Sequence, residues 1–427
     1  MRLGRPGGAR RARSGEEAGR AGPRELAARA LVLGLLGRVR DGALIVREGG
    51  RRHLCGRPSS GEAVPEVVVE SPRTWRVVAT EGAAGLGRAY VAGWWACATL
   101  DELTTLLRVV LRNLDSLERA SALGRRLGSF TRRPVGRARR GGAERLEATL
   151  PGRLPDDALR LVLGEPPTGS SGVFSTPSAS LADAQVEKFE RVCRKLGLSA
   201  ADHVAEVGAG WGGFALHAAA RYGCRVSVAI PSPGRAEAAT ERAKRAGLDD
   251  LVTVVHGDPE ALEGTFDHVV AIEAADDLGD GGPDAFLDRC SALLAHDGML
   301  ALQVVVARER HPRRARDDFL ERYAWPRMRP PTLARLLEAF GRRDDLSLVA
   351  LDDVGQHRAE TLRHWRSAIE PHRLELERLG VDPPSRRLLE FSLCYREAGF
   401  AERRHTELQC FLAKPGWRPQ ALSRPAP

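Results

Sequence analysis

Five short apolar runs alternate with amphipathic, helix-like stretches between residues 203 and 306, and this alternation constrains the fold most strongly. The runs are HVAEVGAG, RVSVAIPS, LVTVVHGD, FDHVVAIEA and GMLALQVVV. Short apolar strands of this kind are buried on both faces of a sheet, and the helices between them cover those faces. The pattern predicts an α/β fold with a doubly wound, Rossmann-like parallel sheet over about residues 151–417.

A glycine-rich loop joins the first run to the helix that follows, in VAEVGAGWGGFALHAA over residues 204–219. Gly208, Gly210 and Gly212 permit a tight turn and let a ligand approach the backbone, and the helix start offers unpaired N–H groups. Dinucleotide and S-adenosylmethionine sites both use such loops, although the spacing here differs from GxGxxG. Glu206, two residues before the first glycine, favours S-adenosylmethionine, because a carboxylate suits its sulfonium and amino groups.

The ends of the next runs carry further candidate contacts for a cofactor. Asp258, in HGDPEAL, is placed to accept a hydrogen bond from an adenine amino group, or alternatively to cap the next helix. The second run ends in VAIPSPGR and lacks the acid that usually binds ribose hydroxyls. That absence, taken alone, weakens a nucleotide-site interpretation, and a generic strand–helix turn is the alternative for the glycine loop.

The chain before residue 151 has a different composition. Residues 1–24 are rich in Gly, Arg and Ala, and we expect a disordered basic tail rather than a transit peptide, because Glu16 and Glu17 follow the acid-free start. Residues 25–117 read as a smaller α+β domain, with strands in GALIVREG and VPEVVVES. Its predicted helices are ELAARALVLGLLGRV and the stretch from Leu100.

An arginine-rich linker is predicted over residues 118–150. Its core, 124–142, holds seven arginines and no acid. The net charge of +9 favours an anionic partner, either an anionic membrane surface or nucleic acid, and the arm is equally consistent with a solvated linker. Near the C-terminus, 308–390 reads as a charged, mostly helical insertion that builds a lid or substrate wall, and 418–427 as a tail.

The cysteines and the apolar runs bear on location. None of the seven cysteines pairs in a CxxC motif, and several lie in apolar runs, which fits a reducing cytosol. No apolar run reaches the ~18 residues expected of a membrane-spanning helix. We therefore expect a cytoplasmic protein, peripheral at the inner face of the membrane if the arm binds lipid.

The glycine loop and several collinear stretches resemble one family. GWGGFA, residues 210–215, is similar to the first motif of the cyclopropane-fatty-acyl-phospholipid synthases and the related mycolic-acid and fatty-acid methyltransferases. That family also lacks the ribose acid and has a Thr/Ser-containing strand end, which Ser232 partly matches. Other stretches resemble family segments between about residues 25 and 417: GLGRAYVAGWW, LADAQVEKFERVCRKLGL, DDFLERYAWPRMRPPTLARL, DDVGQHRAETLRHWR and LEFSLCYREAGF.

The resemblance implies a class I S-adenosylmethionine-dependent methyltransferase fold behind a smaller N-terminal α+β domain. It implies methyl transfer to the cis double bond of an unsaturated phospholipid acyl chain, with a carbocation from which a bound bicarbonate removes a proton. It also implies a homodimer, for which the sequence identifies no interface. The residues that match cofactor contacts are Phe174, Ser175, Glu206, Gly208, Gly210, Trp211, Gly212, Gly213, Ser232, Gly257 and Asp258. Those that match catalytic positions are Asp276, Thr176, Arg358 and Gln303, and no metal site is predicted.

This sequence departs from the family pattern where the chemistry is expected. Thr176, in VFSTPS, replaces a bicarbonate-contacting cysteine, and Phe174 replaces a tyrosine. In AADDLG, Asp276 stands where the family has a glutamate and Asp277 where it has a histidine. Arg358, in GQHRAETL, replaces the tyrosine that helps to hold the anion.

Three interpretations follow from these departures. A working but retuned enzyme is favoured, because an arginine holds an anion at least as well as a tyrosine. A catalytically silent relative that keeps the fold and the cofactor loop is the alternative. A basic nucleic-acid-binding methyltransferase-like protein is the third, disfavoured because the arm has only Phe130 for stacking on bases. For Asp276 itself, capping of a helix that begins near Pro283 is the competing role.

Overall fold

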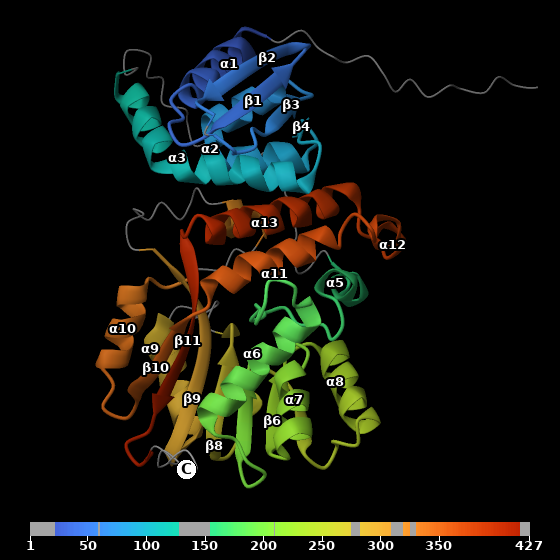
Figure 1. Cartoon of the computed structure of the whole chain (residues 1–427), viewed down its shortest axis with the longest axis vertical. Coiled ribbons are helices and arrows are strands. Elements are labelled where there is room, and N and C mark those ends of the chain that lie inside the picture. Colours follow the sequence, from blue (N-terminus) through green and yellow to red (C-terminus); the bar gives the residue numbers. More distant parts are fainter. Residues whose placement is uncertain are drawn as a thin grey trace, which may run out of the picture.

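The structure is a computed structural model that describes residues 22–58, 60–127, 154–208, 210–274, 282–308, 319–324 and 330–418. These residues form two α/β units stacked along the long axis of the molecule (Figure 1). Most of the predicted basic tail, most of the predicted linker and all but Arg418 of the predicted C-terminal tail lie outside the described residues.

The N-terminal unit is a small sheet with helices packed on it. Its strand order is β2-β1-β3-β4, with β1 and β2 forming an antiparallel hairpin and β3 lying parallel to β1. Both predicted strands and both predicted helices are present, whereas β2 escaped prediction because most of its side chains are exposed. The elements are α1 (Pro23–Leu36), β1 (Ala43–Glu48), β2 (Arg51–Gly56), β3 (Glu66–Val69), α2 (Arg73–Val91), β4 (Trp95–Ala96) and α3 (Leu100–Leu127).

The second unit contains a seven-stranded sheet of order β10-β11-β9-β8-β5-β6-β7. Neighbours among β5 to β9 are parallel, and β11 runs antiparallel to both β9 and β10. The five predicted runs are β5 to β9, so the predicted doubly wound parallel sheet is confirmed. The strands are β5 (His203–Val207), β6 (Arg225–Ile230), β7 (Val252–His256), β8 (Phe266–Ile272), β9 (Leu294–Ala307), β10 (Ser347–Asp353) and β11 (His405–Ala413).

An apolar core lies on each face of this sheet. Val204 of β5 belongs to one core and its neighbour Ala205 to the other, so both faces of the strand are buried and its sequence is mostly apolar, with Glu206 as the buried exception. The first core is closed by α6 (Leu181–Leu196), α7 (Gly213–Tyr222) and α8 (Pro233–Arg245). The second is closed by α9 (Gly282–Leu293) and α10 (Leu333–Gly341).

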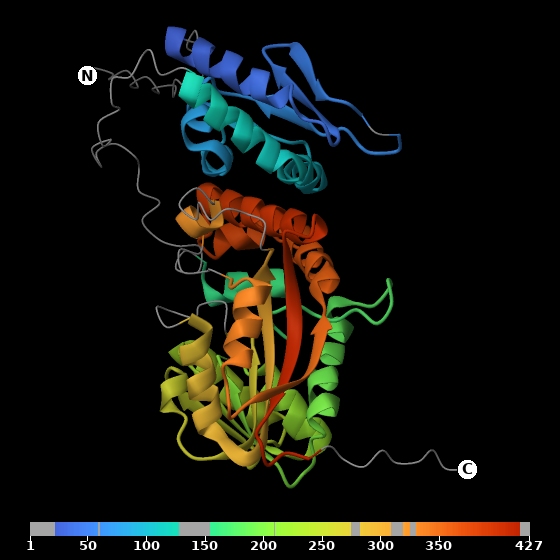
Figure 2. The same ribbon diagram turned by 90° about the vertical axis from the view of Figure 1, so that its left-hand side faces the viewer.

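Two long helices lie between the two units. They are α11 (Gly355–Ser367) and α13 (Pro383–Ala401), joined through the short α12 (Arg373–Arg378), and both views place them between the N-terminal unit and the large sheet (Figures 1 and 2). A third apolar core joins residues of α1, α2 and α3 to residues of α11 and α13. Glu402, just after α13, accepts from Arg108 and Arg112 of α3, so charge as well as apolar burial holds the N-terminal unit in place.

The structure revises two predicted boundaries. The segment 308–390, predicted as a mostly helical insertion, also contains β10, which pairs with β11 at the edge of the sheet. Its apolar run, LVAL, is only four residues long, and so short a run does not distinguish a strand from part of a helix. Helix α3 continues to Leu127, beyond the predicted domain end at residue 117. Among the described helices, none is long and apolar enough to cross a membrane.

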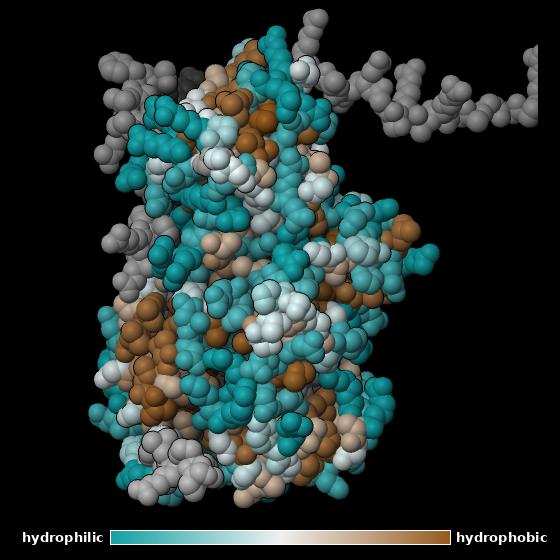
Figure 3. All heavy atoms as spheres, in the orientation of Figure 1, coloured by the Kyte–Doolittle hydropathy of each residue, from teal (hydrophilic) through white to brown (hydrophobic). Residues whose placement is uncertain are grey.

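The edge strand β10 and the neighbouring α10 expose an apolar patch. Leu337, Leu348, Val349 and Leu351 are each 38–41% exposed, and Figure 3 shows brown atoms on the flank where these elements lie. Exposed edge strands invite pairing with another chain. Nothing in the structure shows what covers this patch, so the homodimer stays a prediction.

Candidate active site

The glycine loop lies at the carboxyl end of β5 and leads into α7. Gly208 and Gly212 have φ values of 75° and 67°, a left-handed backbone that other residues rarely adopt. A Cβ at Gly208 would overlap the Cβ of Ala274, so this glycine lets the ends of β5 and β8 approach each other. At Gly210, by contrast, a Cβ would meet no atom within 4 Å. The open space beside the backbone at Gly210 suits a ligand.

Glu206 ties this loop to the helix that follows it. The side chain is 5% exposed, and its Oε2 accepts the backbone N–H of Ala215 at 3.0 Å, in the first turn of α7. Burial raises the pKa of the carboxyl group to about 7, against the opposing effects of that hydrogen bond and of the Lys188 charge. The carboxylate therefore satisfies a helix N-terminus that would otherwise lack an acceptor.

Trp211 is buried in the loop and does not face open space. The guanidinium of Arg235 lies 4.7 Å from the indole ring centroid and that of Arg160 lies 5.5 Å from it. Arg160 belongs to α5 (Asp156–Leu163), and Arg235 pairs with Asp156 of the same helix. The indole thus joins α5 and α8 to the loop through cation–π contacts.

The three other predicted contacts at the strand ends lie on the same edge of the sheet. Ser232 precedes α8, directly after β6, and its side chain makes no capping hydrogen bond. Gly257 and Asp258 follow β7, and Asp258 is exposed and likewise makes no side-chain cap to the short helix after it. Because the capping alternative lacks its hydrogen bond, the carboxylate of Asp258 remains available to a ligand.

A segment around Phe174 is held along one face of α11. The backbone N–H of Gly172 donates to Thr361 Oγ1 at 3.0 Å, and that of Phe174 donates to His357 Nδ1 at 3.2 Å. The Phe174 ring stacks on His364, with ring centroids 5.4 Å apart. This segment therefore lies against the helix that carries Arg358.

Beyond Phe174 the segment becomes exposed. Ser175 and Thr176 are both exposed, and the Thr176 hydroxyl lies 3.4 Å from that of Ser178. Arg358 is instead 1% exposed. The predicted pocket shared by Thr176 and Arg358 stays a prediction, and its third member, Asp276, lies outside the described residues together with Asp277.

Arg358 lies in a cluster of buried polar side chains at the ends of β8, β9 and β11. Its Nη1 donates to Glu273 Oε1 and lies 3.7 Å from Glu407 Oε2. Gln303 Nε2 donates to Glu407 Oε1 at 2.6 Å, and Gln409 Nε2 donates to Gln303 Oε1 at 3.0 Å. The structure thus brings together two of the predicted catalytic residues, Arg358 and Gln303, through a glutamate that was not predicted.

The charges of this cluster balance only if one proton is shared. Arg358 carries one positive charge, whereas Glu273 and Glu407 carry two negative charges when both are ionised. The two carboxyl groups lie close enough to affect each other's ionisation. Burial and the Glu273 charge raise the pKa of Glu407 well above its usual value; at Glu273, burial acts in the same direction, but Arg358 and hydrogen bonds hold the pKa low. Glu407 therefore carries the proton.

Glu273 is held by its backbone as well as by its partners. Its φ of 57° is left-handed, which is uncommon for a residue with a side chain. Its Oε1 also accepts the backbone N–H of Ser171 at 2.6 Å. The carboxylate is therefore fixed between Arg358 and the segment that leads to Phe174.

A buried lysine completes the polar site. Lys188 Nζ donates to Ser170 Oγ and to Gln185 Oε1, both at 2.6 Å, and Gln185 Nε2 donates to the Ser170 carbonyl at 2.8 Å. Burial lowers the pKa of Lys188 to about 7, although the carboxylates of Glu273, Glu407 and Glu206 oppose the shift. Gln185 and Lys188, the AQxxK pair of α6, thus fix the start of the segment that reaches α11.

Comparison with known proteins identifies the family. Residues 153–409 match the family model described as mycolic acid cyclopropane synthetase. The chain belongs to this family. Tuberculostearic acid methyltransferase of Mycobacterium tuberculosis is 28% identical over 334 residues, which cover 76% of this chain and 77% of that protein. The cyclopropane-fatty-acyl-phospholipid synthase of Escherichia coli is 27% identical over 287 residues, which cover 66% and 70%.

A solved structure shows the same fold. Mycolic acid cyclopropane synthase CmaA1, complexed with SAH and CTAB, has a TM-score of 0.57 and 23% identity, over 61% of this chain and 94% of that chain. The predicted class I S-adenosylmethionine-dependent methyltransferase fold is therefore confirmed.

As a member of the mycolic acid cyclopropane synthetase family, the chain has functional candidates that motif matching missed. Glu273 and Glu407 were not predicted, although each leaves a signal: one is a lone acid at the end of VVAI, the other an acid inside the apolar strand HTELQCFLA. Gln185 and Lys188 lay within a quoted motif but received no role. An acid or lysine in or next to an apolar strand or helix face is the signal that would have found Glu273, Glu407 and Lys188, whereas Gln185 left no such signal.

One prediction concerns Gly210. We expect Gly210→Val to weaken S-adenosylmethionine binding at least tenfold, about 1.4 kcal/mol, because the valine fills the open space beside the loop. Calorimetric titration measures the change. Gly234→Val in α8 is the matched control, since a Cβ there also meets nothing within 4 Å. Equal affinities of the two variants for S-adenosylmethionine would show that the cofactor does not bind at this loop.

A second prediction concerns Glu206 and pH. The pKa of Glu206 in the native state is about 7, above the ordinary value of 4.5, so the native state binds the proton more tightly than the unfolded chain. This contribution to stability is complete below pH 4.5 and is lost as pH rises through 7. Glutamine does not titrate, so the Glu206→Gln variant should not lose this stability. Between pH 4.5 and 8 its free energy of unfolding should therefore rise by on the order of 3 kcal/mol relative to that of wild type. Urea unfolding at both pH values tests it, and parallel pH curves would contradict it.

Proposed function

We propose that the chain is an S-adenosylmethionine-dependent C-methyltransferase that acts on the cis double bond of unsaturated fatty-acyl chains of phospholipids. Family membership supports methyl transfer to lipids, and two relatives are named for a fatty acid and for fatty-acyl phospholipids. The observation that carries the proposal is the buried Arg358–Glu273–Glu407 cluster, which lies at the same sheet edge as the glycine loop. Such a cluster provides a proton acceptor shielded from water.

The residues of the loop fit the cofactor. The open backbone at Gly210, after β5, and the available carboxylate of Asp258, after β7, lie at the same edge of the sheet with the end of β6 between them, as an extended nucleoside ligand requires. Ser232, Gly257, Phe174 and Ser175 are the further contacts we assign to it. When bound, S-adenosylmethionine supplies an electrophilic methyl group. Glu206 acts indirectly, because its carboxylate positions the loop on α7.

A proton must leave the substrate after its double bond has been methylated. Addition of a methyl cation leaves a positive charge on the neighbouring acyl carbon, and a base that removes a proton closes a ring or forms a methylene group. The carboxyl pair of Glu273 and Glu407 is a base that the chain itself holds, and Arg358 balances its charge. Bicarbonate, predicted from the family resemblance, is the alternative base. We assign the role to the carboxyl pair, because the Arg358 side chain already has carboxylate partners.

The decisive assay supplies labelled S-adenosylmethionine and vesicles of an unsaturated phospholipid, followed by mass spectrometry of the acyl chains. We expect the acyl chains to gain one carbon, at equal rates in buffer freed of carbon dioxide and in buffer with added bicarbonate. If the acyl chains gain a carbon only when bicarbonate is present, bicarbonate is the base, and the proposed methyl transfer to lipid still holds. Cofactor binding without any gain on phospholipids or free unsaturated fatty acids would favour the silent relative.

A further inference from the structure

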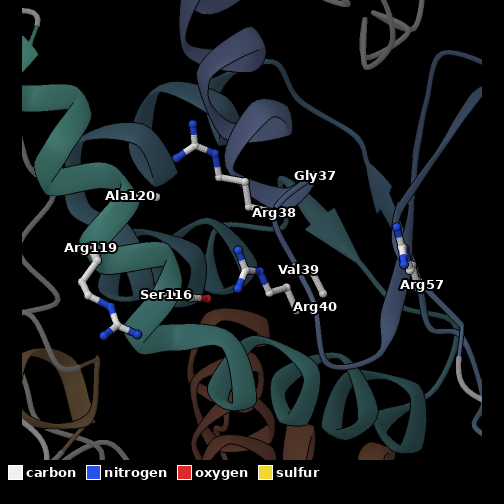
Figure 4. Close-up of a pocket in the computed structure, with 8 residues that line it drawn as sticks. All are labelled: Gly37, Arg38, Val39, Arg40, Arg57, Ser116, Arg119 and Ala120. Carbon is white, nitrogen blue, oxygen red and sulfur yellow. The ribbon is translucent and has the colours of Figure 1, made fainter.

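A basic hollow lies in the N-terminal unit, away from the large sheet. It has a volume of about 910 Å³ and opens between the end of α1, the loop after it and the outer half of α3. Figure 4 shows Arg38 and Arg40 on the loop, Ser116 and Arg119 on α3, and Arg57 beyond β2 on the far side. Four arginines and one serine therefore line a single hollow.

The loop that presents two of these arginines is fixed. Asn113 of α3 is 3% exposed, and its Oδ1 accepts the backbone N–H groups of Arg40 and Asp41 at 2.8 and 3.2 Å. Its amide nitrogen donates to the Asp41 carbonyl at 2.9 Å. The backbone N–H of Arg57 donates to the Gly42 carbonyl at 3.1 Å. The arginines therefore start from an ordered backbone, which lowers the entropy that binding would cost.

The charges in the hollow are unbalanced. No carboxylate lines it, and among the described residues none forms an ion pair with Arg38, Arg40, Arg57 or Arg119. Other arginines of the same unit behave differently: the pairs are Arg29–Glu48, Arg47–Glu66, Arg52–Glu66, Arg108–Glu402 and Arg112–Glu402. Four cations around one hollow repel one another unless an anion lies among them.

We propose that this hollow binds a phosphate group, and that the group is the headgroup phosphate of an anionic phospholipid. Guanidinium forks match the paired oxygens of a phosphate, and a serine hydroxyl adds a neutral donor. The chain supports a membrane source, because α3 leads directly into the arm 124–142 with its seven arginines and no acid. Arginines near an anionic surface add to one another, so the hollow and the arm would bind the same surface. The proposal does not depend on methyl transfer.

The test is sedimentation of the full chain with phosphatidylcholine vesicles, with and without phosphatidylglycerol. We expect binding only to the anionic vesicles. The combined change Arg38→Gln, Arg40→Gln, Arg119→Gln should weaken it on the order of 100-fold, since each cation contributes about tenfold or less at such a surface. The matched control removes three exposed arginines outside the hollow: Arg51→Gln, Arg73→Gln and Arg76→Gln. Its binding should change by less than about tenfold, with both variants unfolding thermally as wild type does.

Four outcomes would overturn the proposal. Equal losses in the two triple variants would mean that only the total charge matters. A variant with the seven arm arginines replaced by glutamine that loses all binding, while the hollow variant loses none, would assign the membrane contact to the arm. Calorimetric binding of inorganic phosphate, lost in the hollow variant without an effect on vesicles, would make this a site for soluble phosphate. Tighter binding to duplex DNA at matched salt, lost in the same variant, would make the partner a nucleic acid.

Discussion

Replacing Arg358 by methionine should lower the free energy of unfolding by about 3–5 kcal/mol at pH 8, because it leaves two buried carboxyl groups without their cation. Methionine keeps much of the volume beside Trp365 and Phe400, whose rings the guanidinium now contacts. The loss should shrink toward pH 5. Without Arg358 the pKa values of Glu273 and Glu407 rise above those of the unfolded chain, and stability from such a shift is present at low pH and lost as pH increases.

Two variants make this expectation specific. Arg363→Met changes an arginine on the same helix that is 46% exposed and pairs with Glu360, and it should cost about 1 kcal/mol or less. Combining Arg358→Met with Glu273→Gln and Glu407→Gln removes the unpaired charges and should restore most of the lost stability. Urea unfolding of all three proteins provides the measurement. Similar losses at positions 358 and 363, or no recovery in the combined variant, would show that the charge balance described here does not hold.

Glu273→Gln should lower methyl transfer by a factor of about 10²–10⁴, the usual contribution of a positioned proton acceptor, because Glu273 is the member of the pair that holds no proton. The amide keeps the size of the side chain and its oxygen can still accept the Ser171 backbone N–H, so cofactor affinity should stay within about a factor of two. Initial rates with labelled cofactor, together with calorimetric binding, separate these effects. Glu390→Gln is the control, since that glutamate is also buried but pairs with Arg386 and Tyr90 in the helix layer. Its rate should remain near that of wild type.

Other results would assign the chemistry elsewhere. A wild-type rate in the Glu273→Gln variant would mean that the base is bicarbonate or Asp276, and Asp276→Asn would then distinguish these two. If the wild type transfers no methyl group, the combined change Thr176→Cys, Asp276→Glu, Arg358→Tyr restores the family residues. A gain of activity in that variant would show that drift at these three positions silenced the chain. No activity in either protein would indicate damage beyond them.

The sequence predicted β5 to β9 because each contains a short apolar run that is followed by a turn or a helix. It did not predict how their ends combine. Gln303 lies opposite Gln409 in the β9–β11 register and opposite Ile272 in the β8–β9 register, which places Glu407 and Glu273 diagonally around it. These neighbours depend on how the strands are aligned in the sheet. The alignment of β9 with β11, about a hundred residues later, cannot be inferred from local periodicity.

Arg358 shows the corresponding limit of comparison with a family motif. Comparison with the family motif identified it as a departure and implied an anion beside it, and its buried partners are indeed anionic. The motif did not reveal that the anions are side chains of the same chain. Glu407 was hidden because one acid in a nine-residue strand resembles an exposed edge position, whereas β11 is an interior strand and the side chain is completely buried. Identifying such a residue requires the position of the strand in the sheet.

The packing of α13 has a consequence for how this molecule divides into modules. Leu103 and Leu107 of α3 share one apolar core with Leu388 and Phe391 of α13, and the Cys394 thiol reaches the Leu100 carbonyl. In the chain, α13 belongs to the C-terminal half, but its packing makes it equally part of the N-terminal unit. A chimera that exchanged residues 1–150 with those of a relative would therefore cut through a core. An exchange that keeps this core intact must carry α13 together with α1, α2 and α3, so we expect substitutions in these helices to be tolerated best in combination.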